Sequence, residues 1–236
     1  MSYLSYISDN DLENAVQKVI NCIRQAQARP DTSLYKNVID PFSAIFDGVV
    51  DGISFEDWLK REKVRQVQKT VQNAIGEFHQ EVIGSIPGWQ NLGTGNLVDV
   101  CNTNLNIIAE IKNKHNTVKG SDRIVIYDDL LHALGMPNYQ NFIAYYVELV
   151  PQKDKKKLIY NRPFTPADKK TGTRRPPNQN IIIIKGQDFY DMATGIPGAL
   201  SMLFDILPEV ISKITGVEPL SQVEKTNFRT LFDRAY

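Results

Sequence analysis

Two carboxylates and a lysine interrupt stretches of the chain that otherwise have the apolar character of buried β-strands. Asp99 lies in "NLVDVCN", and Glu110 and Lys112 lie in "IIAEIKNK". We expect residues 97–102 and 106–113 to form an antiparallel hairpin. Because side chains alternate between the two faces of a strand, the three charged residues then share one face.

The expected hairpin turns at Asn104-Leu105, so that opposed residues have numbers that sum to 209. Asp99 then lies across from Glu110, and the second face of the hairpin is apolar. Its opposed pairs are Val100 with Ala109 and Val98 with Ile111.

Directly opposed like charges destabilise a sheet, because their side-chain carbons are only about 5 Å apart. Two such carboxylates either share a proton or hold a cation. Hard oxygen ligands suit Mg²⁺, which proteins usually hold with one or two carboxylates and a substrate phosphate. Lys112 could then face the scissile phosphate and the attacking water. The plain alternative is that Glu110 and Lys112 are polar positions on the solvated face of a sheet.

The surrounding pattern predicts an α/β (α+β) protein, with a mixed central sheet flanked by helices and a helical N-terminal part. Polar residues ahead of apolar stripes mark helix starts at Ser8, Asp40-Pro41, Ser54 and Ser221, and the helix from Ser54 should end at Gly84. Strands are expected at 97–102, 106–113, 142–150 and 180–185, and further helix at 122–134 and 187–214. We expect one domain, 1–236, made of a mostly helical part (1–85), a sheet core (86–215) and a C-terminal helix (216–236).

A basic segment spans residues 151–179. It holds nine Lys and Arg residues against Asp154 and Asp168, a balance of +7 in 29 residues, although the whole chain is neutral. Clustered cations in a loop are the electrostatic signature of contact with a phosphate backbone. The alternative is a solvated loop without a partner.

The amino-acid composition further limits the class of protein and the cellular compartment that we expect. Two cysteines, Cys22 and Cys101, without a CxxC pair, fit a reducing compartment and argue against a disulfide scaffold or a cysteine-rich zinc site. The start "MSYLSYISDN" lacks the pattern of a secretion signal, and no apolar run approaches about 18 residues. We therefore expect a soluble cytoplasmic protein without a membrane partner.

Asp99 followed by "EIK" at 110–112 resembles the signature of the PD-(D/E)xK nuclease superfamily, with Val98 where that family often has proline. The wider text, from "VIDPFSAIFDGVVDGISFEDWLKREKVRQVQKTVQNAIGEFHQ" to "IIAEIKNKHNTVKG", resembles the type II restriction endonucleases that cut GGNCC-like sites. The resemblance implies a bacterial or archaeal enzyme that cuts both strands of double-stranded DNA with Mg²⁺ and leaves 5′-phosphate ends. It also implies a cognate DNA methyltransferase that acts on the same site.

The resemblance assigns roles to this chain's residues. Asp99, Glu110 and the Ile111 carbonyl would bind Mg²⁺, for which Mn²⁺ could substitute, and Lys112 would orient the water and stabilise charge on the phosphate. Families of this type often add an acid or a glutamine from the preceding helix. Glu77 is the candidate, with Gln80 and Glu81 on adjoining turns and Gly76 allowing close approach to the sheet.

The residues that follow the lysine should meet the DNA. These are Asn113, Lys114, His115, Asn116 and Lys119, and in the basic segment Arg174 and Arg175 are the expected readers of a G·C-rich target. For each, phosphate contact is the alternative. A palindromic target favours a homodimer, and "IPGALSMLFDILPEVISKI" is either a contact surface or core. Two other functions stay open: a structure-selective or repair nuclease, and an inactive DNA-binding module.

Overall fold

The computed structural model describes residues 2–29, 31–93, 95–116, 120–153, 159–168 and 171–236. The helices in these ranges are α1 (Asp9–Gln27), α2 (Pro41–Asp51), α3 (Phe55–Gly84), α4 (Gly120–Gly135), α5 (Gly186–Thr194), α6 (Ala199–Thr215) and α7 (Gln222–Ala235). Two short 3-10 helices are η1 (Asp31–Lys36) and η2 (Pro137–Tyr139).

The sheet is mixed, as predicted, and its strands lie in the order β1-β2-β3-β4-β6-β5. They are β1 (Gln90–Asn91), β2 (Val100–Asn102), β3 (Ile107–Lys114), β4 (Ile143–Val150), β5 (Arg162–Pro163) and β6 (Ile181–Lys185). β4 runs parallel to both β3 and β6, and the other pairings are antiparallel.

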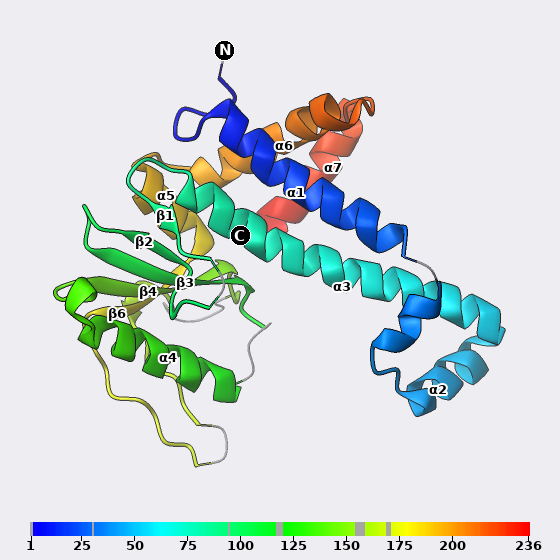
Figure 1. Ribbon diagram of the computed structural model, residues 1–236, viewed down its shortest axis with the longest axis horizontal. Coiled ribbons are helices and arrows are strands. Elements are labelled where there is room, and N and C mark those ends of the chain that lie inside the picture. Colours follow the sequence, from blue (N-terminus) through cyan, green and yellow to red (C-terminus); the bar gives the residue numbers. More distant parts are fainter. Residues whose placement is uncertain (1, 30, 94, 117–119, 154–158, 169–170) are drawn as a thin grey trace.

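Each face of the sheet carries its own hydrophobic core. One core joins Ile107, Ala109 and Ile111 of β3 to side chains of α1, α3, α5 and α6. The other joins Ile108 of β3 and alternate residues of β4 to α4. Figure 1 shows α1 and α3 side by side on one side of the sheet and α4 on the other. The side chains of β3 therefore alternate between two buried layers, so a charged residue on this strand is only partly exposed to water.

The predicted helix starts are confirmed because their caps are local. The hydroxyls of Ser8, Ser54 and Ser221 each accept a hydrogen bond from the backbone amide three residues later. Asp40 caps α2, and Pro41 occupies its first turn. α3 ends at Gly84, where an added Cβ would lie 2.6 Å from the Asn91 amide nitrogen.

Two expectations about glycines and helices need correction. The stretch 187–214 is not one run of helix, because Gly195 and Gly198, both with positive φ, separate α5 from α6 by a bend of 92°. Gly76 does not serve close packing, since an added Cβ there would meet no atom within 4 Å. The close approach of α3 to the sheet occurs at Gly84 instead.

No single helix within the described ranges is both long enough and apolar enough to cross a membrane. Helices α5 and α6 reach the required length and composition only when they are taken together across their bend.

Candidate active site

The hairpin of β2 and β3 has the predicted register. Val100 pairs with Ala109, and the ladder continues through Asn102 paired with Ile107. The Asn102 side-chain oxygen accepts hydrogen bonds from the amides of Asn104 and Leu105, each at 3.0 Å, and so holds the predicted turn.

The regular pairing of β2 with β3 begins at Val100 and does not include Asp99, so the strand is shorter than the predicted 97–102. The Asp99 amide donates to the Ala109 carbonyl at 3.0 Å, one place out of step with the pairs below it. Its carboxylate oxygen Oδ2 accepts from the Ile111 amide at 2.7 Å, a position that a backbone carbonyl would fill in a regular ladder. The Asp99 side chain thus takes the hydrogen-bonding position that a backbone carbonyl of β2 would occupy if the strand continued.

This irregularity moves Val98 to the other layer. Val98 packs in the core beneath α4, whereas Val100 packs in the core beneath α1 and α3. The predicted pairing of Val98 with Ile111, and with it the wholly apolar face, is therefore wrong. The step out of register nevertheless leaves the Asp99 carboxylate beside β3.

The Asp99 and Glu110 carboxyl groups share a hydrogen bond. Burial raises the pKa of Asp99, and hydrogen bonds from Ile111 and Gln80 together with the Lys112 charge offset only part of that rise. Burial and then the Asp99 charge raise the pKa of Glu110 to about 7. Two buried carboxylates that repel each other hold a proton at neutral pH, or exchange it for a cation.

Lys112 supplies one positive charge to this pair. Its Nζ lies 2.5 Å from Oε1 of Glu110, and its side chain is about one-third exposed. Burial alone would lower the Lys112 pKa, but the neighbouring Glu110 and Asp99 charges outweigh it and the pKa is raised. With the lysine charged, two ionised carboxylates still leave one uncompensated negative charge.

The contact from α3 to this pair comes from Gln80. Its side chain lies within hydrogen-bonding reach of the Asp99 carboxylate and lowers the pKa of that group. Glu77, the predicted candidate, is exposed one turn earlier, and within the described residues no bond joins it to Asp99 or Glu110. Glu81 forms an ion pair with Lys18 at 2.8 Å.

Helix α4 adds a residue that the sequence reasoning missed. The charge of Asp129 further raises the pKa of Glu110, which places this acid on the α4 side of the pair. The acidic pair "DD" at 128–129 breaks an otherwise apolar run in "IVIYDDLLHAL". This acidic pair in an apolar run was the signal in the sequence for a functional residue. Only the packing of α4 on the sheet shows that Asp129 acts on Glu110.

Beyond Lys112 the chain continues along the edge of the site. The Asn113 side chain donates to the Gln72 carbonyl at 3.2 Å, and the His115 amide donates to the Val150 carbonyl at 3.0 Å. Lys114 still pairs with Val150 in the sheet, and Asn116 is exposed. Lys119 lies outside the described residues.

The two arginines of the basic segment have different surroundings. Arg175 binds Asp128 of α4 through two hydrogen bonds of 2.8 and 2.5 Å, and so anchors this segment to the helix. Arg174 is exposed, with one guanidinium nitrogen 3.3 Å from the Thr165 carbonyl. Five residues of the segment at 154–158 and two at 169–170 lie outside the described ranges.

The donor set fits a hard divalent cation. Asp99 and Glu110 offer carboxylate oxygens, and the uncompensated charge beside them favours a positive ligand. Within the described residues, no cluster of three or more His, Cys, Asp and Glu side chains is arranged to hold a metal. Any ion here must therefore take its remaining ligands from the backbone, water or a substrate.

A mixed sheet flanked by helices, with two partly buried carboxylates and a lysine beside one hairpin, defines the restriction-endonuclease-like class of fold. The family model described as Eco47II restriction endonuclease matches residues 4–216. The chain is 39% identical to the type II restriction enzyme Eco47II of Escherichia coli over the full length of both proteins. It is 31% identical to the type II restriction enzyme Sau96I of Staphylococcus aureus, over 87% of this chain and 78% of that protein. The chain belongs to the Eco47II restriction endonuclease family, and it is a site-specific endonuclease that acts on double-stranded DNA.

Proposed function

We propose that this type II restriction enzyme uses Mg²⁺ to hydrolyse both strands of a short palindromic GGNCC-like site and leaves 5′-phosphate ends. The observation that carries the proposal is the carboxylate pair of Asp99 and Glu110, which lies partly buried beside Lys112. A structural role would not require an acid whose pKa is raised by burial and by the charge of a second acid beside it. The target sequence follows from the family resemblance and not from the geometry.

Asp99, Glu110 and the Ile111 carbonyl would hold the metal, and Mn²⁺ is expected to substitute for Mg²⁺. When bound, the ion lowers the pKa of a water ligand and draws charge from the phosphate oxygen. The Asp99 carboxylate is held in place by the Ile111 amide and by Gln80, so it is already oriented before substrate arrives.

Lys112 acts on the substrate in this proposal. The Lys112 ammonium group would donate to the scissile phosphate and to the attacking water, where it would stabilise the developing negative charge. Gln80 acts as a positioning residue, because it reaches Asp99 and not the lysine. Glu77 remains a weaker candidate for the same role.

The strand end after Lys112 is proposed to face the DNA. Asn113, Lys114, His115, Asn116 and Lys119 would contact bases or phosphates there. In the basic segment, Arg174 is exposed, whereas Arg175 would have to exchange its ion pair with Asp128 for a guanine edge or a phosphate. A homodimer is proposed for the twofold target, and a cognate methyltransferase would modify the same site and need not bind this chain.

The test is digestion of a DNA of known sequence with Mg²⁺, with Mn²⁺ and with EDTA, followed by sequencing of the fragment ends. Cleavage at discrete sites with either metal, and none in EDTA, is the expected result. Glu110→Ala and Lys112→Ala should each lose at least about a thousandfold in rate while duplex affinity is kept. Glu56→Ala, which changes an exposed acid on the first turn of α3, is the control.

Other results would replace the proposal. Preference for junctions or flaps over linear duplex would favour a structure-selective or repair nuclease. Duplex binding by pure protein that never nicks DNA with either metal would favour an inactive binding module. Gln80→Ala should slow cleavage and raise the Mg²⁺ concentration needed for half-maximal rate, whereas a loss of rate without that change would argue against its positioning of Asp99.

A further inference from the structure

Helix α2 is apolar but none of its residues is buried. Its large apolar side chains recur at the spacing that forms one stripe on a helix: Phe42, Ile45, Phe46, Val49 and Val50. All five are more than 60% exposed. A stripe of this kind normally faces a protein core.

The polar side of α2 faces its own chain instead. Asp47 accepts a hydrogen bond from the Trp58 indole nitrogen at 3.4 Å, and Asp51 forms an ion pair with Arg61, so both acids are turned toward α3. Asp47 and Asp51 lie one turn apart and about opposite the apolar stripe, at 100° per residue. The stripe is thereby directed away from the molecule.

The neighbouring segments extend this surface. We define the apolar arm as η1, α2 and the first part of α3, residues 31–67, and Figure 1 shows α2 at the end of α3 that lies far from the sheet. Its exposed apolar side chains are Tyr35, Val38, Phe42, Ile45, Phe46, Val49, Val50, Phe55 and Val64. They are 57–99% exposed, which at ordinary side-chain areas gives on the order of 1,000 Å².

The exposed apolar area of the arm is larger than the apolar patches that monomeric proteins usually expose to water. The largest apolar patch on a typical monomeric protein is about 300–600 Å². A stable protein interface takes about 800 Å² from each partner, and obligate homodimer interfaces are the more apolar ones. The exposed apolar area of the arm is therefore comparable in size to one half of a dimer interface.

The charges on α2 limit the classes of partner that could bind this helix. The formal charges on α2 and its cap are the carboxylates Asp40, Asp47 and Asp51, so this helix offers no cation to the phosphates of DNA or of an anionic membrane. Trp58 of the arm and Gln80 at the active site are separated by roughly 33 Å along α3. A partner bound at the arm therefore leaves the carboxylate pair accessible.

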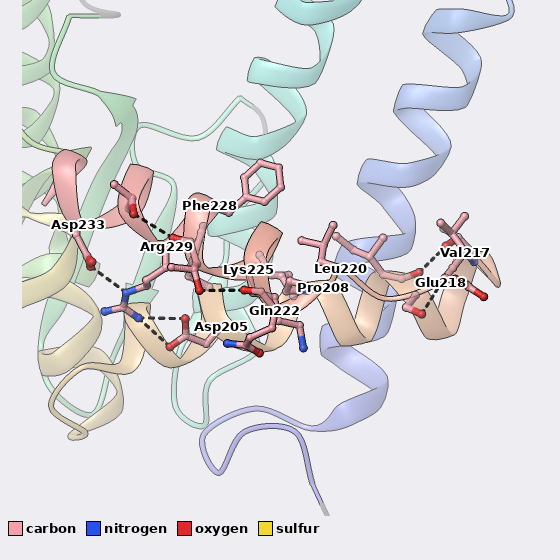
Figure 2. A pocket seen from close by; sticks show the side chains of 17 residues that line it. Asp205, Pro208, Val217, Glu218, Leu220, Gln222, Lys225, Phe228, Arg229 and Asp233 are labelled. Carbon is pink, nitrogen blue, oxygen red and sulfur yellow. Dashed lines mark hydrogen bonds and ion pairs between the residues drawn. The ribbon is translucent and has the colours of Figure 1, made fainter.

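A second apolar surface is less suited to a partner. The groove between α6 and α7, about 850 Å³ in volume, is seen in Figure 2. Arg229 crosses its wall and binds both Asp205 and Asp233, at 2.8 and 2.9 Å. An apolar partner there would have to desolvate this charged network, a cost that the α2 stripe does not impose because all five of its side chains are apolar.

We propose that the apolar arm is the dimerisation surface, on which the α2 stripe packs against the α2 stripe of a second copy of this chain about a twofold axis. An isologous contact of this kind closes at two copies. The choice of a second copy rests on the proposed function, because cleavage of both strands of a palindrome needs two active sites related by a twofold axis.

The experiment measures mass in solution by sedimentation or light scattering across a concentration series. The arm variant is Phe46→Glu with Val49→Glu, which cannot disturb the core because neither side chain is buried. The matched control is Val223→Glu with Leu231→Glu on α7, an equally exposed pair with the same charge change. Circular dichroism confirms that both variants are folded.

The wild type and the α7 control should have twice the chain mass of 26.8 kDa. The arm variant should be monomeric at the same concentrations, with a dissociation constant raised at least about 100-fold. A monomeric wild type, or an arm variant that stays dimeric, would overturn the proposal. Loss of the dimer in the α7 control alone would assign the interface to that helix.

The two proposals fail separately. A protein that dimerises through the arm but never cuts DNA would keep the interface and lose the nuclease mechanism. A protein that cuts at discrete sites while the arm variant remains dimeric would keep the mechanism and lose the interface.

Discussion

Replacing Glu110 with glutamine should make the metal-free protein more stable at high pH but not at low pH. The pKa of Glu110 rises from 4.5 to about 7 because the side chain is buried and faces Asp99. At about 1.36 kcal/mol for each pKa unit, ionising this carboxyl in the folded protein costs about 3 kcal/mol. The amide of glutamine is neutral at every pH and can donate to Asp99 as the protonated acid does.

The sign follows from proton binding. Between pH 4.5 and about 7 the folded protein keeps a proton on Glu110 that the unfolded chain has released. Stability is therefore fully present below pH 4.5, falls as the pH rises through this window, and stays low above pH 7. For a chain of this length about 3 kcal/mol corresponds to a melting temperature change of about 6–12 °C.

The assay is thermal unfolding in EDTA at pH 5, 6, 7 and 8. Glu110→Gln should melt close to the wild type at pH 5 and about 6–12 °C above it at pH 8. Glu56→Gln, at an exposed position, shows the background effect of exchanging an acid for an amide. Adding Mg²⁺ at pH 8 should then raise the melting temperature of the wild type more than that of Glu110→Gln.

An equal difference at pH 5 and pH 8 would refute the reasoning, because it would mean that Glu110 does not change its charge between them. A variant less stable than the wild type at pH 8 would also refute it. That result would show that the ionised carboxylate is stabilised by Lys112 more than it is destabilised by Asp99 and burial.

Three further predictions concern stability measured by urea unfolding. Glu148→Ala should cost about 3 kcal/mol, because Glu148 is buried and binds Arg123 at 3.1 Å and the Tyr160 hydroxyl at 2.6 Å; an effect below 1 kcal/mol would mean that the pair is solvated. Gly186→Ala should cost about 2 kcal/mol or more, because the added Cβ would lie 2.6 Å from the Leu149 carbonyl oxygen, and an unchanged midpoint would show that β4 and α5 can separate freely. Ser221→Ala should cost about 1 kcal/mol, since it removes the capping box with Glu224; Ser221→Asp should restore most of the loss.

Features decided within a few residues could be predicted from the sequence. The caps at Ser8, Ser54 and Ser221 depend on one hydroxyl and an amide three residues away, so the sequence is sufficient to place them. The register of the hairpin followed from a short turn and a buried apolar pattern. The sequence "GIPG" at 195–198 also marks the break between α5 and α6.

Features decided by packing could not be predicted in the same way. Gln80 and Glu77 are both on α3, and only the angle at which α3 crosses the sheet determines which of them reaches Asp99. Asp129 depends likewise on the placement of α4. The step out of register at Asp99 required knowing that its side chain would take the Ile111 amide.

The carboxylate pair and the apolar arm depart from the usual burial pattern in opposite directions: charged groups are partly buried in the first, and apolar side chains are exposed in the second. Each departure indicates a binding partner. Acids buried beside each other are unfavourable unless a cation or a proton joins them. An apolar stripe turned outward, while Asp47 faces the protein, is unfavourable unless another apolar surface covers it. Because natural sequences are otherwise locally consistent, such violations concentrate where binding compensates for them. The two partners act through different variables: the first should appear as a dependence on pH and divalent metal, and the second as a dependence on protein concentration.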